Sequence, residues 1–413
     1  ADSDTRCKNL PGLPELCSAP MPSYATYREA VRGRRLPLAF CDLDLLERNL
    51  DALARRARGN PIRVASKSVR CVEVLRRTLA HEGFAGVMAY TAAEAAHLAD
   101  HGFDDLLVAY PTVEPSEIRQ ALEHVAAGKT ITLMVDDAEQ VRRLSALAAE
   151  RDVELPLCLD VDMALPLPGL FFGVRRSPIR TAAQARRLGQ AIHAASHVRL
   201  EGVMGYEAQI AGLPDGTPNR AFNLFVRQLK KRSIRDLRRR RGAVVDALRA
   251  DGHALRFVNG GGTGSLESTA GDPSVTESTA GSGLYAPGLF DEFAGFKHLP
   301  AAGFAVPVVR RPGPGYVACH GGGYVASGGA GKDKLPKPYL PAGLALLDQE
   351  GAGEVQTPLK VEGPITPAIG DPVFFRHAKA GELCERFETL LLLRGGAVVG
   401  EAPTYRGEGK CFL

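Results

Sequence analysis

Lys67 is the residue of this chain whose type and place most favour covalent chemistry. It ends the short apolar run at residues 62–66, and a helical pattern begins just after it, from Val69. The carboxyl ends of barrel strands are where barrel enzymes keep their reacting groups. A partly desolvated ammonium there loses its proton readily and can form a Schiff base with an aldehyde. The alternative is an ordinary solvated lysine, which is the commoner case for this residue type.

A glycine-rich segment, Val-Asn-Gly-Gly-Gly-Thr-Gly-Ser at residues 258–265, follows another predicted strand. Successive glycines let backbone amides converge on an anion, and the hydroxyls of Thr263 and Ser265 can donate as well. Loops after late barrel strands commonly hold phosphate. The alternative is a flexible loop without a ligand. Residues 279–283 (Thr-Ala-Gly-Ser-Gly) are a second, weaker candidate for the same anion.

A strand-end lysine and a phosphate cradle on one barrel together favour pyridoxal phosphate. The cradle would anchor the phosphate of this cofactor, and Lys67 would hold its aldehyde. The ring of the cofactor could then withdraw electrons from a carbanion beside the imine.

The elements that position these residues alternate between short apolar runs and amphipathic helices. This spacing predicts an α/β fold, a (β/α)₈ TIM-like barrel over residues 35–300. No Gly-x-Gly-x-x-Gly turn follows the first strand, as an open doubly wound sheet would favour. Prolines and glycines then crowd short β-rich pieces, which predicts an antiparallel β domain made of residues 1–34 and 301–413. The predicted barrel strands are residues 38–43, 62–67, 86–90, 105–110, 131–136, 155–161, 200–206 and 256–261.

Composition excludes several function classes. The 413 residues are 45% hydrophobic and 24% charged, with a net charge of +4, which is too small to favour a nucleic-acid or membrane partner. The basic run at residues 230–241 has helical spacing and is interpreted as a solvated helix face. Eight cysteines without a CxxC pair indicate a reducing compartment. With no long apolar stretch and no signal pattern, we expect a cytoplasmic protein.

The motifs together resemble the fold-type III pyridoxal phosphate enzymes, the alanine racemase-like barrels. Within this class the chain is similar to the D-threonine aldolase and D-serine dehydratase branch, and it most resembles bacterial proteins labelled amino acid deaminase/aldolase. The segments that carry the resemblance are 37–40 (Pro-Leu-Ala-Phe), 65–68 (Ala-Ser-Lys-Ser), 202–207 (Gly-Val-Met-Gly-Tyr-Glu), 260–265, 275–277 (Val-Thr-Glu), 280–282 (Ala-Gly-Ser), 370–373 (Gly-Asp-Pro-Val) and 376–377 (Arg-His).

The resemblance implies roles for individual residues. Lys67 would form the Schiff base, and Tyr206 would line the pocket at a strand end, unless this tyrosine merely caps the barrel core. Tyr206 and Gln209 join Lys67 as candidate catalytic residues. The residues implied around the phosphate are Gly261, Gly262, Thr263, Gly264, Gly281 and Ser282, with Ser265 from the loop itself.

Two departures from the family pattern bear on the chemistry. Gln209 stands where the family's Tyr-x-Gly-His motif has its histidine, and an amide can hydrogen-bond but cannot shuttle a proton at neutral pH. Phe171 stands two residues before Gly173-Val174, where the family has an arginine that contacts the pyridine nitrogen of the cofactor. How well the bound ring withdraws electrons is therefore open.

The resemblance also implies a divalent metal near the end of the chain. The family pairs a histidine with a cysteine or aspartate one residue away, whereas here His377 is followed by Glu382 and Cys384 at a longer spacing. Imidazole plus the thiolate of Cys384 would suit zinc, and Glu382 in its place would favour manganese or magnesium. The alternative is a buried structural cysteine and a histidine without metal.

The function that the resemblance implies is a pyridoxal phosphate- and divalent-metal-dependent lyase. It would cleave a β-hydroxy-α-amino acid of D configuration into glycine or a small amino acid plus an aldehyde. Three alternatives stay open: a D-serine-type dehydratase or deaminase acting by β-elimination, an amino-acid racemase, and a non-catalytic pyridoxal phosphate-binding protein. The resemblance further implies that the protein is a homodimer. It also implies that the molecule it binds is a small amino-acid substrate.

Overall fold

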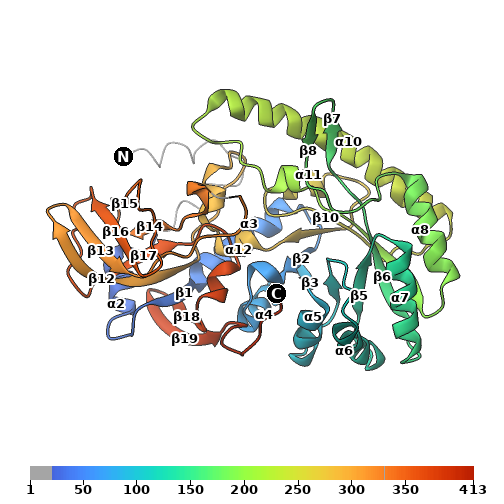
Figure 1. Ribbon diagram of the computed structural model, residues 1–413, viewed down its shortest axis with the longest axis horizontal. Helices are drawn as coiled ribbons and strands as arrows, with labels where there is room; N and C mark the ends of the chain where they lie inside the picture. Colours follow the sequence, from blue (N-terminus) through green and yellow to red (C-terminus); the bar gives the residue numbers. More distant parts are fainter. Residues whose placement is uncertain (1–20, 330) are drawn as a thin grey trace. The chain divides into compact units, whose positions relative to one another are not determined.

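The computed structural model describes residues 21–329 and 331–413, and they form two compact units. The barrel unit comprises Leu53–Lys67, Leu75–Gly281 and Phe412–Leu413. The β unit comprises the described part of Ala1–Ala52 together with Ser68–Val74 and Ser282–Cys411. Residues 1–20 of the predicted β domain lie outside the described residues. Figure 1 shows both units and labels many of their helices and strands.

Eight strands close the barrel in the order β10-β11-β2-β3-β4-β5-β6-β9, and every neighbouring pair is parallel. Helices run outside these strands (Figure 1), as a parallel sheet buried on both faces requires. The (β/α)₈ prediction is confirmed. The strands are β2 (Ile62–Ala65), β3 (Phe84–Ala89), β4 (Leu106–Val108), β5 (Ile131–Val135), β6 (Leu155–Asp160), β9 (Val198–Gly205), β10 (Phe257–Gly260) and β11 (Glu277–Ala280), and the helices between them include α4 (Val72–Leu79), α5 (Ala92–Asp100), α6 (Pro115–Ala126), α7 (Ala138–Ala149), α8 (Ala182–Ala194) and α10 (Arg220–Ala250).

The eighth barrel strand, β11, has a polar sequence that does not predict a strand. Its four residues, Glu-Ser-Thr-Ala, are nevertheless all buried. The carboxylate of Glu277 accepts hydrogen bonds from Arg63 Nε at 2.7 Å and from Asn259 Nδ2 at 2.8 Å. The hydroxyl of Thr279 donates to Asn259 Oδ1 at 3.0 Å. Buried polar groups are stable when they are hydrogen-bonded, so this network replaces the usual apolar pattern.

The predicted first barrel strand, residues 38–43, is wrong in its placement. As β1 (Leu38–Asp42) it lies in the sheet of the β unit. It pairs antiparallel with β12 (Ala302–Gly313) and parallel with β18 (Thr389–Arg394). All five of its residues are buried. A continuously apolar run predicts a buried strand but does not indicate which of two buried sheets the strand joins.

The β unit contains a nine-stranded sheet in which β17 pairs with both β12 and β14. All its strand pairs are antiparallel except that of β1 with β18, which is parallel. This one parallel pair makes the sheet of the predicted antiparallel domain a mixed sheet. The rings of Tyr27, Phe40 and Phe374 pack together in its core with centroids 5.2 to 5.9 Å apart. Its other elements are α2 (Tyr24–Ala30), β13 (Tyr316–His320), β14 (Lys337–Leu340), β15 (Leu344–Leu346), β16 (Gln356–Val361), β17 (Pro372–Arg376) and β19 (Ala397–Pro403).

The basic run at residues 230–241 lies in α10 and is only partly solvated. Arg241 is fully buried, and Lys230 is buried with its Nζ 3.2 Å from a carboxylate oxygen of Asp215. The prediction of a solvated helix face is wrong for these two side chains, because each pairs with carboxylates inside the barrel unit. The exposed members are Lys231, Arg232, Arg235 and Arg239.

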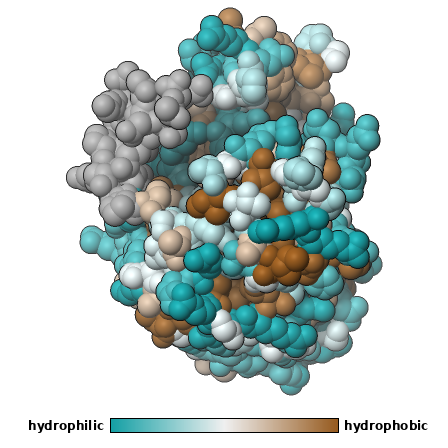
Figure 2. Space-filling view, turned by 90° about the vertical axis from the view of Figure 1, so that its left-hand side faces the viewer, coloured by the Kyte–Doolittle hydropathy of each residue, from teal (hydrophilic) through white to brown (hydrophobic). Residues whose placement is uncertain are grey.

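In the described part of the chain, no helix combines the length and apolar character that crossing a membrane requires. On the face drawn in Figure 2, hydrophilic residues cover most of the surface and hydrophobic residues lie in small groups between them. Single exposed apolar side chains are normal for a globular protein.

Candidate active site

Lys67 lies directly after β2, in the short 3₁₀ turn Ser66–Ser68. Because β2 is parallel to its barrel neighbours, its carboxyl end opens on the same rim as theirs. The Nζ atom of Lys67 donates a hydrogen bond to the Oη of Tyr110 at 2.6 Å. Tyr110 follows β4, and no motif in the sequence predicts that it belongs to the site. The predicted lysine therefore lies at the rim in contact with a phenol.

Two cationic side chains act on the phenol of Tyr110. Burial raises the pKa of this phenol, but the Lys67 ammonium and the Arg176 guanidinium outweigh burial and hold the pKa below its ordinary value. The guanidinium carbon of Arg176 lies 5.9 Å from the ring centroid. An ionised Tyr110 can accept the proton that Lys67 must lose before its amine attacks a carbonyl.

A cavity of about 210 Å³ opens beside Tyr110. Its wall consists of residues at or just after the carboxyl ends of strands β4, β5, β6 and β9, together with Val174 and Arg176. It therefore lies at the carboxyl-end rim, where barrel enzymes hold their substrates. Its polar lining residues are Tyr110, Asp136, Asp160, Asp162, Arg176 and Tyr206.

Two carboxyl groups of this wall have raised pKa values. Asp160 is 8% exposed, and burial, reinforced by the negative charge of Asp136, raises its pKa to about 7 against the opposing effect of Arg176. Burial also raises the pKa of Asp136, although Gln140 donates a hydrogen bond to its carboxylate at 2.9 Å. A carboxyl group that titrates near neutral pH, as that of Asp160 does, is characteristic of an acid–base site.

Tyr206 follows β9 and lines the same cavity, as predicted from the resemblance. Burial raises its pKa to about 12, although the positive charge of Arg176 opposes this effect. The guanidinium carbon of Arg176 lies 5.2 Å from the Tyr206 ring centroid. A Cβ atom added to Gly262 would lie 3.2 Å from the Tyr206 ring, so the glycine loop packs directly on this tyrosine.

The glycine loop after β10 is held in one conformation by its own hydrogen bonds. Gly261 has a φ of +89°, and a Cβ there would lie 2.9 Å from Thr269 Oγ1, so only glycine fits. The amide of Gly261 donates to Glu207 at 2.7 Å, and the amide of Gly262 donates to Ser265 Oγ at 3.1 Å. Because these two amides are used inside the loop, the candidate donors to an anion are the groups of the residues that follow, beginning with Thr263.

Glu207 and Arg241 form the buried support of this loop. The carboxylate of Glu207 accepts hydrogen bonds from Gly261, from Thr269 Oγ1 at 2.7 Å and from Arg241 Nη2 at 3.2 Å. Arg241 also donates to Asp272 at 2.8 Å. Glu207 appears in the sequence only as part of a motif, and Arg241 only as one of a basic run. No local pattern could have paired them, because they are brought together by the fold.

The second glycine turn leaves the barrel beside the first. β11 ends at Ala280 and is followed directly by Gly281 and Ser282. Because β11 pairs in parallel with β10, both turns leave the barrel at the same rim. The hydroxyl oxygen of Ser282 lies 3.2 Å from that of Ser68, next to Lys67 in the chain.

Gln209 and Phe171, the two departures from the family pattern, do not line this cavity. Gln209 is buried, and its Nε2 donates to the carbonyl oxygen of Met163 and to Ser233 Oγ, both at 2.8 Å. Phe171 lies in β8 (Leu170–Phe172), the second strand of a hairpin with β7 (Leu165–Leu167), and the Arg175 guanidinium carbon is 4.0 Å from its ring centroid. Both residues therefore contact other parts of the protein outside the cavity wall.

The predicted metal ligands lie in the β unit. Both ring nitrogens of His377 are buried without a hydrogen-bond partner among the described residues, and burial lowers its pKa to about 3, so it is a neutral imidazole suited to a metal. The thiol of Cys384 instead hydrogen-bonds Tyr285, and Glu382 accepts a hydrogen bond from the amide of Ser327 at 2.9 Å. Within residues 21–329 and 331–413, no group of three potential ligands includes His377.

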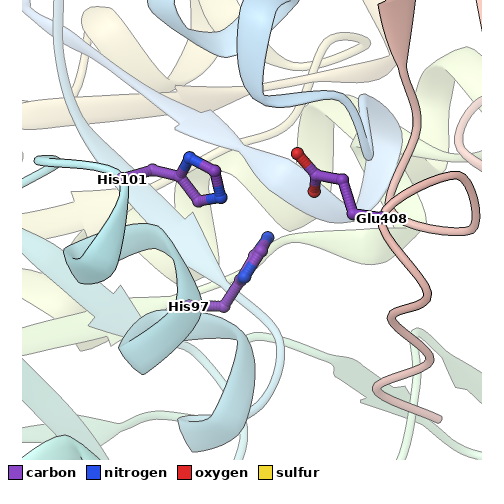
Figure 3. A group of neighbouring side chains, drawn as sticks. All are labelled: His97, His101 and Glu408. Carbon is purple, nitrogen blue, oxygen red and sulfur yellow. The ribbon is translucent and has the colours of Figure 1, made fainter.

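A pair of imidazoles lies elsewhere in the barrel unit. His97 and His101 stand on successive turns at the end of α5, with ring centroids 4.6 Å apart (Figure 3). The ring of Phe412 packs 5.5 Å from that of His97.

The sequence of this chain matches a known protein family. The family model described as alanine racemase, N-terminal domain, matches residues 41–285, well over half of the chain. The chain belongs to the alanine racemase N-terminal domain family. The resemblance drawn from the motifs is thereby confirmed at the level of the family.

Relatives of this family member include aldolases. The chain is 29% identical over 240 residues to a 3-hydroxy-D-aspartate aldolase of Paracoccus denitrificans (strain Pd 1222) and 24% identical over 254 residues to a D-threonine aldolase of an Arthrobacter species. The first match covers 57% of this chain and 57% of the relative, and the second covers 61% of each. The matched region thus spans less than two thirds of either relative.

Solved structures share the fold of this family member over most of its length. A D-threonine aldolase from Filomicrobium marinum superposes with a TM-score of 0.76 at 21% identity, covering 90% of this chain and 95% of that one. A D-threo-3-hydroxyaspartate dehydratase from Delftia sp. HT23 superposes with a TM-score of 0.73 at 20% identity, covering 90% and 98%. A cysteine-to-alanine variant of that dehydratase is described as being in the metal-free form.

Proposed function

We propose that the chain is a pyridoxal phosphate-dependent lyase that cleaves a β-hydroxy-α-amino acid of D configuration by a retro-aldol reaction. The products would be an aldehyde and glycine or another small amino acid. The observation that carries this proposal is the contact of Lys67 with Tyr110 at the barrel rim, beside a cavity lined by the buried carboxyl group of Asp160. The names of the two aldolase relatives support the reaction class and the D configuration.

The residues present fit the cofactor. Thr263, Gly264 and Ser265 follow two glycines that leave no room for a side chain, and this tight loop is suited to a phosphate. Gly281 and Ser282 follow the neighbouring strand at the same rim. When bound, the cofactor supplies an aldehyde for Lys67 and a ring that withdraws electrons from the substrate Cα atom.

The side chains of the cavity divide the remaining work. Tyr110 accepts the proton of the Lys67 ammonium, which frees the amine. Arg176 lies over the rings of Tyr110 and Tyr206 and forms no ion pair within the described residues, so its guanidinium is available for a substrate carboxylate. Tyr206 stays protonated and can donate a hydrogen bond to a substrate oxygen.

Elimination is the second candidate function, because a neighbour with this fold is a 3-hydroxyaspartate dehydratase. The same placement would let Lys67 remove the α-proton while the β-hydroxyl leaves, giving a keto acid and ammonia. A divalent metal held by His377, the homodimer and the cytoplasmic location all stay predictions.

Product analysis tests the proposal. The protein purified with pyridoxal phosphate is incubated with D-threonine, with 3-hydroxy-D-aspartate and with their L counterparts, and aldehyde, keto acid and ammonia are each measured. We expect aldehyde from the D substrates and none from the Lys67→Ala variant. Keto acid and ammonia in equal amounts, without aldehyde, would establish the elimination instead.

A further inference from the structure

Asp160 is a buried carboxyl group in the wall of the cavity. It is the last residue of β6 and pairs with Met204 of β9, two residues before Tyr206 in the chain. Its carboxyl forms no ion pair in the described part of the chain, and the amide of the following Val161 donates to the carbonyl oxygen of Met204 at 2.8 Å. It lines the cavity together with Asp136, the residue that follows β5.

The two neighbouring carboxylates differ from Asp160 in their partners. Asp162 is ion-paired with Arg180 and also accepts a hydrogen bond from the amide of Ala164 at 2.6 Å. Asp136 is hydrogen-bonded to Gln140 through both its backbone amide and its carboxylate. Asp162 thus has a counter-charge and Asp136 has a side-chain hydrogen-bond donor, whereas Asp160 has neither among the described residues.

Burial and the surrounding charges set the protonation of Asp160. Burial and the carboxylate of Asp136 raise its pKa to about 7, and Arg176 opposes them. A carboxyl group with this pKa gains and loses its proton near neutral pH, as an acid–base catalyst must. The titratable and charged groups that interact with it are Asp136, Asp162, Arg176, Tyr110 and Cys158.

Other candidates for the base of the cleavage step have different roles in the barrel unit. Gln209 has no proton to exchange at neutral pH and lies outside the cavity wall. Tyr206 keeps its proton because its pKa is about 12. Lys67 is assigned to the cofactor aldehyde, and Tyr110 is assigned to the proton of Lys67. Cleavage of the Cα–Cβ bond nevertheless needs an acceptor for the β-hydroxyl proton.

We propose that Asp160 accepts this proton from the β-hydroxyl of the substrate. The inference rests on the proposed retro-aldol function. The O–H bond breaks, and its proton moves to a carboxylate oxygen of Asp160. The O–H electron pair becomes the second bond of the aldehyde carbonyl, while the Cα–Cβ pair remains on Cα. Cα then takes up one proton from solvent and Asp160 returns one, so the reaction consumes no protons overall.

Matched variants of the holoenzyme test the inference. Asp160→Asn keeps the shape of the side chain but cannot accept a proton, and Asp136→Asn removes the like charge beside it. The pH dependence of kcat/KM is measured with D-threonine or 3-hydroxy-D-aspartate, whichever the wild type cleaves faster. Infrared titration of the holoenzyme follows the C=O stretch of protonated carboxyl groups, which reports Asp160 independently of turnover.

In the wild type we expect kcat/KM to rise with pH through about 7, because the base must be ionised. Asp160→Asn should lower kcat by about 10²- to 10⁴-fold at unchanged cofactor content, and the infrared band that titrates near this pH should disappear. Asp136→Asn should move the midpoint to lower pH, because one negative charge fewer lowers the pKa of Asp160.

An Asp160→Asn enzyme with wild-type rate, or an unchanged infrared titration in that variant, would overturn the inference while leaving the aldolase intact. If Asp160→Asn does not fold, the Asp136→Asn variant provides the test. A midpoint of the pH dependence of kcat/KM that is the same in Asp136→Asn as in the wild type would then overturn the inference. A wild-type holoenzyme that cleaves neither amino acid refutes the proposed function, and the inference falls with it.

Discussion

The amide of Gly261 donates a hydrogen bond of 2.7 Å to the buried carboxylate of Glu207. The same carboxylate accepts hydrogen bonds from Arg241 and Thr269. The glycine loop is thus tied to a side chain at the end of the neighbouring strand β9 and, through it, to α10. A loop held in this way is organised before any anion binds, which removes part of the ordering cost of binding.

We expect Glu207→Gln to weaken pyridoxal phosphate binding by roughly tenfold or more, because the amide nitrogen would face the donors of Arg241 or Thr269. Removing a buried charge partner should also destabilise the fold by about 3 kcal/mol. Cofactor titration and urea unfolding measure the two effects. The exposed Glu123, which pairs with Arg151 on the surface, provides the control Glu123→Gln. Equal cofactor affinity in both variants would contradict this role of Glu207.

The contact between Lys67 and Tyr110 has a spectroscopic consequence. In the cofactor-free protein, Tyr110 should form phenolate at a lower pH than an ordinary tyrosine, because the ammonium of Lys67 outweighs burial. Ultraviolet titration of wild type against Tyr110→Phe isolates this phenol. In Lys67→Met the ammonium is gone and burial remains, so the pKa of Tyr110 should rise. If the pKa of Tyr110 is the same in Lys67→Met as in the wild type, the ammonium of Lys67 does not lower it.

The polar strand β11 depends on Arg63, which is fully buried and paired with Glu277 and Asp105. Arg63→Ala leaves Glu277 without its charge partner, and we expect a loss of about 3 to 5 kcal/mol in the free energy of unfolding. The exposed pair of Arg119 with Glu150 gives the control, since Arg119→Ala should cost less than about 1 kcal/mol. Similar urea midpoints for the two variants would show that the network does not hold the strand.

Metal content tests the predicted role of His377. We expect purified protein dialysed against zinc, manganese or magnesium to bind a divalent ion that His377→Ala loses, because neither ring nitrogen has a hydrogen-bond partner among the described residues. The exposed His320 supplies the control His320→Ala. Cys384→Ser shows whether the thiol leaves Tyr285 to become the second ligand. Metal bound equally by wild type and His377→Ala would refute the prediction.

Local sequence patterns predicted the barrel because its apolar strands and amphipathic helices each repeat over short windows. They missed β11, whose polar residues are stable only through Arg63 and Asn259, and they placed β1 in the wrong sheet. Lys67 and the glycine loop carry signals in their own neighbourhoods. Tyr110, Asp160 and Arg176 do not, since the cavity arises only when the ends of separate strands meet.

The attachment of the cofactor to Lys67 is the central claim, and borohydride reduction followed by peptide mass spectrometry tests it most directly. The protein is saturated with pyridoxal phosphate, reduced and digested, and each lysine is examined for the added pyridoxyl mass. We predict the modification at Lys67, at one per chain, and its absence from Lys67→Ala. Modification spread over surface lysines, with Lys67 unmodified, would contradict the account.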